Sequence, residues 1–279
     1  MTENAYAKIN LSLDVVRRRD DGYHDVNMIM QSLELHDTVH AEFTDGGIEV
    51  TCDSGAVPNG EGNIAYRAAR LMIDKCGADC GVRIHIEKRI PVCAGLAGGS
   101  TDGAAVIRAM NGLLGADFDA ETLESIAAKV GSDVPFCING GTALAFGTGT
   151  DIKKLPPFGN HIVLLVKPPI DVPTPWVYKN LNLGAIVHPD IDGFISALSR
   201  GDADAALATS GNVLESVTAS KYPIIEKIKS EMTNRGAKFA MMSGSGPTVF
   251  GIFEKTTDAE NAARFFKKSF DEVIVTKTV

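Results

Sequence analysis

Apolar and polar residues alternate near the start of the chain. From Ala5 to Val15 the odd-numbered positions are apolar, whereas the even-numbered positions, which include Lys8 and Asn10, are mostly polar. Because successive side chains of a strand point to opposite faces, Lys8 and Asn10 are predicted neighbours on a polar face. A charged turn follows at residues 17–22, and a second extended run covers about residues 23–35. The pattern predicts two long strands.

Shorter strands and capped helices are predicted between residues 39 and 131. Two strands at 39–43 and 48–52 flank Thr44-Asp-Gly-Gly47, which is typical of a hairpin turn. Alternation over 82–86 predicts a further strand. Asn63 is predicted to cap a helix that runs to about Cys76. Asp119 is predicted to cap another that runs to Val130, where Gly131 ends it.

The second half of the chain begins after a segment rich in glycine and proline at residues 147–157. We expect a boundary there, with domains at residues 1–155 and 156–279. The order of elements beyond it is close to βαββαβ, a ferredoxin-like outline with extra helices. The predicted strands are 161–167, 238–242, 248–253 and 272–277, and the predicted helices are 174–180, 191–198, 203–217, 223–235 and 258–270.

Composition restricts the class of protein. The formal net charge of −8 argues against a broad nucleic-acid or anionic-membrane surface, so an anionic ligand would need a local site. Five cysteines, an odd number, and no recognisable signal peptide favour reduced thiols in the cytoplasm. Cys76 and Cys80 have no second Cys or His pair nearby, so we expect no metal site there. The longest apolar run, residues 162–166, is too short to span a membrane.

The segment from Pro91 to Asp102 joins a predicted strand to a predicted helix through glycines and hydroxyl residues. Glycine lets backbone N–H groups approach an anion, and the start of a helix attracts negative charge. We expect Ser100 or Thr101 to cap that helix. The segment matches neither the Walker A nor the dinucleotide-binding glycine pattern. Taken alone, a loop that only turns the chain explains its glycines equally well.

Two other places could carry chemistry. Asp133 lies between two predicted elements, where Pro135 disfavours helix at the residue before it. An aspartate in such a place is more often a cap or a turn residue. The Ser243-Gly-Ser-Gly-Pro247 sequence lies between two predicted strands, and alone it favours a tight hairpin. Together with the earlier glycine segment, it suggests two backbones that face one polyanion.

Three ordered motifs give the chain a resemblance to the GHMP kinases over almost its whole length. They are Ala7-Lys-Ile-Asn10, the segment from Pro91 to Asp102, and Ser243–Pro247. The resemblance implies an α+β fold of two domains, the second ferredoxin-like, and ATP as the phosphoryl donor. Ala97 stands where glycine is common in the family, Thr101 where serine is common, and Ser132 where alanine is common.

Four segments are similar to one branch of that family. They are Ala7–Leu11, Asp21–His24, Ser132–Phe136 and Pro173–Tyr178. Members of this branch phosphorylate the 2-hydroxyl of 4-diphosphocytidyl-2-C-methyl-D-erythritol in the non-mevalonate isoprenoid pathway. The expected partner is thus a small cytidyl diphosphate molecule, with no nucleic acid and no membrane. No oligomer is predicted.

The resemblance implies roles for seven side chains. Lys8 would stabilise charge on the transferred phosphoryl group, and Asp133 would accept or orient the proton of the acceptor hydroxyl. The other five would bind the acceptor: Asn10 and Thr174 near the reaction centre, and Tyr23, His24 and Tyr178 at the cytosine base. Each also has an ordinary structural explanation, such as a solvated lysine, a helix cap or a packed aromatic ring.

For ATP, the resemblance points to the glycine segment around the phosphates and to Asn63 and Lys88 near the nucleoside. Mg²⁺ is expected with ATP, held mainly by ATP oxygens with help from Ser100, because no all-protein metal cage is evident. The expected phosphate-binding residues are Pro91, Val92, Cys93, Ala94, Gly95, Leu96, Ala97, Gly98, Gly99, Ser100 and Thr101.

Three alternatives stay open at this point. A mevalonate or homoserine kinase of the same family is disfavoured by Tyr23, His24 and Tyr178, because neither acceptor carries a base to stack. A nucleotide sensor without turnover has no need of both Lys8 and Asp133. A nucleic-acid-binding βα module is disfavoured by the net charge of −8.

Overall fold

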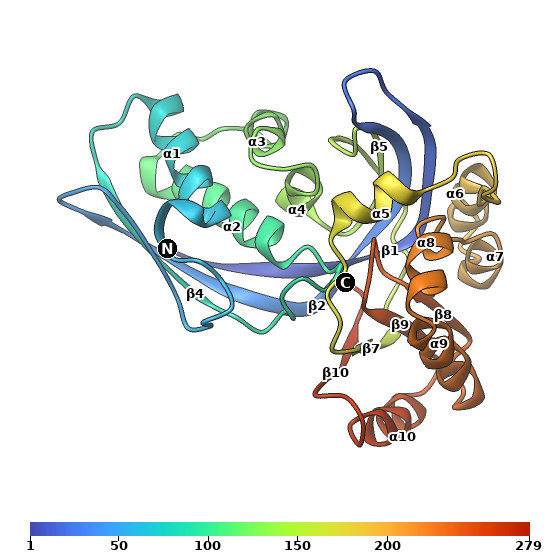
Figure 1. Ribbon diagram of the computed structural model, residues 1–279. Coiled ribbons are helices and arrows are strands. Elements are labelled where there is room, and N and C mark those ends of the chain that lie inside the picture. The colour runs from blue at the N-terminus through green and yellow to red at the C-terminus, as the bar shows by residue number, and fades with distance from the viewer. The chain divides into compact units, whose positions relative to one another are not determined.

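The computed structural model describes residues 1–279, which form two compact units (Figure 1). Unit 1 comprises residues 1–7, 35–92 and 97–140, and unit 2 comprises residues 8–34, 93–96 and 141–279. Strands β1 (Thr2–Arg18) and β2 (His24–Thr44), which pair with each other, contribute residues to both units. The sequence boundary after residue 155 stays a prediction, because these units are defined by packing and not by chain order.

Unit 1 contains the C-terminal half of β2, with β3 (Ile48–Cys52) and β4 (Gly81–Glu87). β4 pairs antiparallel with β2 and parallel with β3, so β3 is not the hairpin partner of β2. The hairpin prediction was therefore wrong. The turn after β2 instead lies against the start of β4, where Val82 N donates to Gly47 O at 2.8 Å. A Cβ on Gly81 would lie 2.5 Å from Thr44 Oγ1, so glycine permits this approach.

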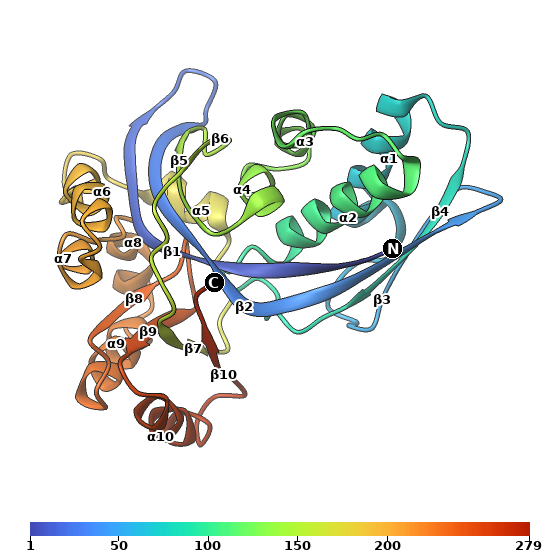
Figure 2. The ribbon, with the colours of Figure 1, turned by 180° about the vertical axis from the view of Figure 1, so that it is seen from behind.

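Helices of unit 1 gather on one face of this sheet, as both views of the ribbon show (Figures 1 and 2). Two predicted caps are confirmed: Asn63 Oδ1 accepts from Ala65 N at 2.9 Å, and Asp119 Oδ1 accepts from Thr122 N at 2.9 Å. The helices are η1 (Gly60–Gly62), α1 (Ile64–Cys76), α2 (Gly98–Leu114), α3 (Ala120–Ala128) and α4 (Val134–Asn139).

Helix α2 begins two residues earlier than Ser100 and without a side-chain cap. Ala97 adopts a left-handed φ of 59° and turns the chain directly into the helix at Gly98. The prediction of a cap at Ser100 or Thr101 was therefore wrong. Thr101 is buried, and its hydroxyl donates to Tyr6 O at 2.8 Å instead.

Unit 2 contains a four-stranded antiparallel sheet in the order β10-β7-β9-β8. With α10 between the last two strands in sequence, this order is ferredoxin-like, so the predicted fold class is confirmed. The N-terminal half of β2 pairs with β5, and β5 pairs with β6. The strands are β5 (Thr142–Gly147), β6 (Asp151–Lys154), β7 (Ile162–Lys167), β8 (Phe239–Met242), β9 (Val249–Phe253) and β10 (Glu272–Lys277).

The single helix predicted over residues 203–217 is broken in the structure. Its middle, residues 209–214, forms a parallel bridge from Asn212 to Leu13. Ser210, Gly211 and Asn212 are weak helix formers, so backbone bonds to β1 replace helical ones there. No helix is both long and apolar enough to cross a membrane. The helices of unit 2 are α5 (Thr174–Asn180), α6 (Ile191–Ser199), α7 (Ala203–Ala208), α8 (Glu215–Lys221), α9 (Ile224–Asn234) and α10 (Thr256–Phe266).

Candidate active site

Lys8 and Asn10 lie side by side on β1, as the alternation predicted. Lys8 is only 4% exposed, Asn10 is fully buried, and Lys8 Nζ donates to Asn10 Oδ1 at 2.8 Å. Asn10 Nδ2 in turn contacts Met28 Sδ at 3.6 Å. Removing an ammonium group from water is costly, so a lysine held in this way is not an ordinary solvated strand residue.

The two glycine-rich segments of the sequence meet within unit 2. Ser243 Oγ donates to Gly95 O at 2.9 Å, and Lys8 N donates to Leu96 O at 3.1 Å. A Cβ added to Gly95 would lie 2.2 Å from Ser243 O, and the φ of Gly95 is +76°. Both facts require glycine at this position. The C-terminal glycine loop (Ser243–Pro247) is therefore packed against residues 93–96 and next to β1.

Thr174, the first residue of α5, joins the same group of residues. Its hydroxyl shares a hydrogen bond of 2.8 Å with the Ser245 hydroxyl. A Cβ on Gly244 would lie 3.5 Å from Asn10 Oδ1. The structure thus brings together five features predicted from distant parts of the sequence: Lys8, Asn10, Gly95, Thr174 and the C-terminal glycine loop.

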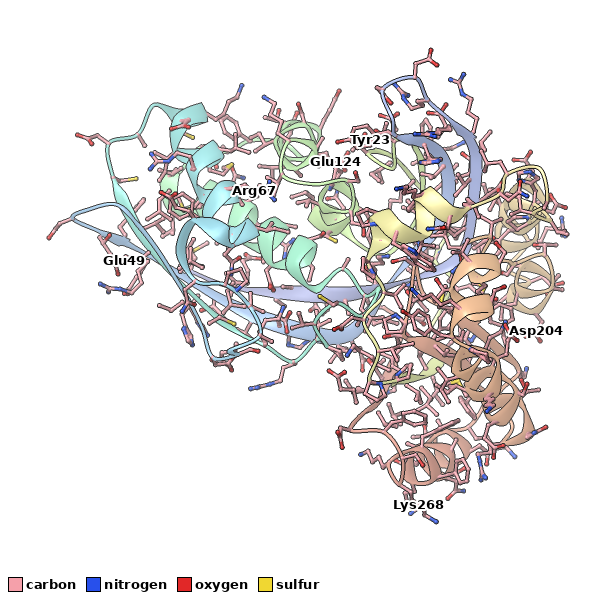
Figure 3. All side chains as sticks on the ribbon, viewed as in Figure 1. Tyr23, Glu49, Arg67, Glu124, Asp204 and Lys268 are labelled. Atoms are coloured by element: carbon pink, nitrogen blue, oxygen red, sulfur yellow. The ribbon has the colours of Figure 1, made fainter.

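Two of the three predicted base-binding residues are in ring contact. The rings of His24 and Tyr178 lie 5.1 Å apart at an interplanar angle of 42°. Tyr23 lies in the turn that joins β1 to β2 and is 63% exposed (Figure 3). Partial burial and the nearby charge of Arg18 lower the pKa of His24, so its imidazole is neutral at pH 7. A neutral imidazole offers one donor and one acceptor to a ligand.

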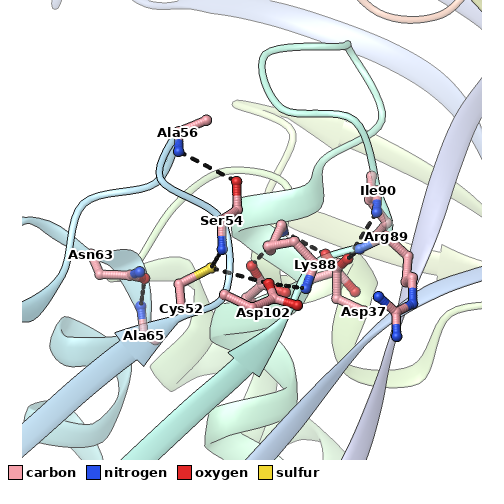
Figure 4. A network of polar contacts seen from close by, with 12 residues as sticks. Asp37, Cys52, Ser54, Ala56, Asn63, Ala65, Lys88, Arg89, Ile90 and Asp102 are labelled. Atoms are coloured by element: carbon pink, nitrogen blue, oxygen red, sulfur yellow. Dashed lines mark hydrogen bonds and ion pairs between the residues drawn. The ribbon is translucent and has the colours of Figure 1, made fainter. Parts of the chain in front are cut away.

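In unit 1, Lys88 is held between two carboxylates (Figure 4). Its Nζ donates to Asp37 Oδ2 at 2.5 Å and to Asp102 Oδ2 at 2.7 Å, and its side chain is 6% exposed. Burial alone would lower the pKa of Lys88, but the charges of Asp102 and Asp37 outweigh this effect and raise it. These two bonds use two of the three donors of the ammonium, and the role of Lys88 toward ATP stays a prediction.

Asp102 carries the most unusual electrostatics of this cluster. Burial raises its pKa to about 7, although Lys88 opposes the shift, and Asp37 raises it further. Its Oδ1 has no hydrogen-bond partner. Sequence reasoning gave no role to Asp37 or Asp102. Asp102 is the last residue of the glycine segment, so its place in that motif could have indicated a role. Asp37 lies in no motif of the sequence.

The start of α2 has the features of an anion site. Cys93 and Ala97 both have positive φ, which folds the segment before the helix into a compact turn. A Cβ on Gly98 would lie 3.3 Å from Lys88 Nζ, whereas a Cβ on Gly99 would make an ordinary contact at 3.4 Å with Ile64 Cδ1. The first N–H groups of a helix are free of intrahelical partners and can bind phosphate oxygens.

Asp133 lies between α3 and α4, at the junction of two elements that the sequence predicted, but α4 begins at Val134, so the expectation that Pro135 disfavours helix there was wrong. It occupies the N-cap position of α4 and lies in a turn, as the structural interpretation expected, although its side chain makes no hydrogen bond that caps the helix. The residue is half-buried. Its position agrees with the sequence prediction, while its role toward the acceptor stays a prediction.

Comparisons with known proteins match this architecture. Residues 63–141 match the family described as GHMP kinases N terminal domain, and residues 182–272 match GHMP kinases C terminal. A protein of Acetivibrio thermocellus named 4-diphosphocytidyl-2-C-methyl-D-erythritol kinase is 50% identical over 276 residues, which is 99% of this chain and 98% of the relative. A protein of Clostridium acetobutylicum with the same name is 45% identical over 280 residues and the full length of both chains.

Solved structures agree. A crystal structure of 4-(cytidine 5'-diphospho)-2C-methyl-D-erythritol kinase is 33% identical, with a TM-score of 0.84 over 100% of this chain and 99% of that one. Homoserine kinase from Cytophaga hutchinsonii, at 20% identity and a TM-score of 0.77 over 100% of this chain and 94% of that one, shares the fold. The motifs, the ferredoxin-like sheet and these matches agree: the chain belongs to the GHMP kinase family.

Proposed function

We propose that the protein is an ATP-dependent kinase. It transfers the γ-phosphoryl group of ATP to the 2-hydroxyl of 4-diphosphocytidyl-2-C-methyl-D-erythritol. The observation that carries the choice of acceptor is the position of Tyr178 on α5. Thr174 bonds the C-terminal glycine loop, and Tyr178, four residues later and so on the same side of the helix, contacts the His24 ring. One short helix thereby links a phosphoryl-transfer loop to a pair of rings suited to a base.

Lys8 supplies a fixed positive charge for the transferred phosphoryl group. The transition state of phosphoryl transfer is loose, with charge spread over the equatorial oxygens, so catalysis rests on positioning and electrostatics. Lys8 is nearly buried and its ammonium is oriented by Asn10, which reduces the reorganisation needed during the reaction. Asn10 also gives the acceptor an amide near the reaction centre.

Asp133 is assigned to the proton of the acceptor hydroxyl. The carboxylate of an aspartate is a weak base, and a general base of this kind accepts a proton as the hydroxyl attacks. In a loose transition state the hydroxyl loses its proton late, so orientation of the hydroxyl contributes more than basicity. Thr174 is assigned a hydrogen bond to the acceptor.

ATP is assigned to the glycine segment, where backbone N–H groups meet its phosphates, and to Asn63 and Lys88 near the nucleoside. Mg²⁺ neutralises phosphate charge when it is bound with ATP. Its oxygen ligands would come mainly from ATP, and the Ser100 hydroxyl fits this donor set. Thr101 fits less well, because it is only 1% exposed and its hydroxyl is directed at Tyr6 O.

The base is assigned to Tyr23, His24 and Tyr178. Aromatic rings stack on any base, whereas a hydrogen-bonding edge selects among bases. A neutral His24 can present such an edge. We place the reaction in the cytoplasm, where the five free cysteines stay reduced, with a small molecule and no nucleic acid as the partner.

A substrate panel tests the proposal. Purified protein is incubated with ATP and Mg²⁺ and, separately, with the cytidyl diphosphate substrate, mevalonate or homoserine, while ADP release is followed. We expect turnover on the cytidyl substrate alone, and none when EDTA removes Mg²⁺. Turnover on mevalonate or homoserine without turnover on the cytidyl substrate would reject the proposed acceptor. Tight ATP binding without any turnover would favour a nucleotide sensor.

A further inference from the structure

The break between α7 and α8 places a buried amide beneath the C-terminal glycine loop. Asn212 Nδ2 donates to two backbone carbonyls, Met242 O and Gly244 O, both at 2.8 Å. The residue is 8% exposed. These carbonyls belong to the end of β8 and to the loop itself, so one side chain fixes the path of the chain as it leaves the sheet.

Two neighbours of Asn212 hold the same stretch. Glu215 Oε1 accepts from Met242 N at 2.7 Å, and the Thr218 hydroxyl donates to Ser245 O at 3.1 Å. Lys229 Nζ donates to the second oxygen of Glu215 at 2.7 Å and so orients it. Three side chains of residues 212–218 therefore form hydrogen bonds to four backbone atoms between Met242 and Ser245.

Asn212 is itself held in place. Its Oδ1 accepts from Leu214 N at 3.0 Å. On either side of it, Leu13 N donates to Gly211 O at 2.8 Å, and Val213 N donates to Leu13 O at 3.1 Å. Leu13 lies on β1, three residues after Asn10. The segment thus couples the loop to the strand that carries Lys8 and Asn10.

The C-terminal glycine loop contacts residues that are assigned to the reaction, whereas Asn212 itself contacts none of them. Ser243 bonds Gly95, Gly244 lies next to Asn10, and Ser245 bonds Thr174. We propose that Asn212 is a positioning residue for phosphoryl transfer, an inference that rests on the proposed function. Its two hydrogen bonds hold the C-terminal glycine loop in the position in which the loop contacts Gly95, Asn10 and Thr174.

The position needs an amide. Its NH₂ group supplies two donors for two carbonyls, while its oxygen accepts from Leu214 N, and no other side chain of this size combines these roles. An aspartate in its place would face both carbonyls with a negatively charged oxygen, so the Asn212→Asp substitution should push the loop away from its present position. A buried carbonyl that loses its donor is unfavourable, so the loop is expected to move and not to stay unpaired.

Two substitutions test the inference. Asn212→Asp keeps the shape and removes both donors, and Thr218→Val keeps the shape and removes the hydroxyl that holds Ser245. Thr218→Ser is the conservative partner, because it retains the hydroxyl. Asp202→Ala is the matched control, since it removes the cap contact from Ala205 N to Asp202 in α7 and touches no residue of the loop.

We expect kcat to fall about 100-fold in Asn212→Asp, the loss typical of a reacting group displaced by about 1 Å. Thr218→Val should show a smaller loss of kcat, and Thr218→Ser should have a kcat close to that of the wild type. The Kd for cytidine 5'-diphosphate should stay within about twofold of the wild-type value, because the hydrogen bonds of Asn212 go to Met242, Gly244 and Leu214 and not to His24 or Tyr178. Hydrogen exchange of residues 243–248 should speed up in Asn212→Asp and Thr218→Val but not in Asp202→Ala.

Two outcomes would overturn the inference. One is wild-type kcat in folded Asn212→Asp and Thr218→Val. The other is an equal loss of kcat in Asp202→Ala when its Tm is lowered as much as that of Asn212→Asp. That result would show that the loss of kcat follows from lower stability and not from the position of the loop. If wild-type protein lacks turnover on every acceptor, the proposed function fails, and the comparison of hydrogen exchange among Asn212→Asp, Thr218→Val and Asp202→Ala still decides whether Asn212 holds the loop. If Asn212→Asp does not fold, Thr218→Val and Thr218→Ser decide it.

Discussion

The ring of His24 on β2 lies 5.1 Å from the ring of Tyr178 on α5, tilted by 42°. More than half of the chain separates the two residues in sequence. Their contact places an imidazole with a lowered pKa beside an aromatic face. This arrangement can divide base recognition into stacking by one ring and selection by the other.

We predict that Tyr178→Ala weakens the binding of the cytidyl substrate and of a uridyl analogue to a similar degree. Loss of one stacking face should cost about 1–3 kcal/mol, and the cost does not depend on the base. His24→Ala should instead narrow the preference for cytidyl over uridyl, because uracil exchanges the amino donor of cytosine for a carbonyl acceptor. The measurement is kcat/KM for both analogues on the three proteins. An unchanged ratio in His24→Ala would assign selection to other groups.

Replacing Asp133 by Asn should lower kcat by roughly two to four orders of magnitude, the range usual for loss of a general base. Its affinity for ATP should stay close to wild type. Lys8→Met retains the buried stem and removes the charge, so it should also lower kcat, through lost electrostatic stabilisation. Steady-state kinetics and ATP titration separate the two effects. Wild-type turnover in both variants would show that the assigned centre is wrong.

Gly95→Ala and Gly99→Ala form a matched pair. At Gly95 the new Cβ would meet Ser243 O at 2.2 Å with φ at +76°, and a left-handed non-glycine residue costs about 1–3 kcal/mol. At Gly99 the nearest atom is 3.4 Å away. We expect Gly95→Ala to lose thermal stability and ATP affinity together. Gly99→Ala should retain its stability, so any loss of ATP affinity there reports contact with the nucleotide. Equal Tm values would contradict this reasoning.

The stability of the wild type relative to Asp102→Asn should depend on pH. The pKa of Asp102 is about 7 in the folded protein, against an ordinary value of 3.8, so between these values the folded state binds more protons. This contribution is fully present below about pH 4 and is lost as pH rises to about 7. Asparagine does not titrate, so the Tm of the variant minus that of the wild type should increase from about pH 5 to about pH 8. A difference that stays constant in thermal unfolding would refute the shifted pKa.

The sequence by itself determined the features that depend on local pattern. Alternation predicted that Lys8 and Asn10 share a face, and Asn63 and Asp119 were correct as helix caps, because a strand period and a cap involve only a few neighbouring residues. The βαββαβ order also followed from periodicity. The three motifs, read together, indicated the family and the kind of chemistry.

Only the tertiary structure decided which distant groups meet. Periodicity predicted one helix across residue 212, but hydrogen bonds to Leu13 and to the carbonyls of Met242 and Gly244 outweigh local helix propensity there. In the same way, β3 pairs with β4 and not with β2, and Lys88 is buried between Asp37 and Asp102. The physical reason is common to these cases: buried polar groups must find partners, and those partners lie far away in sequence.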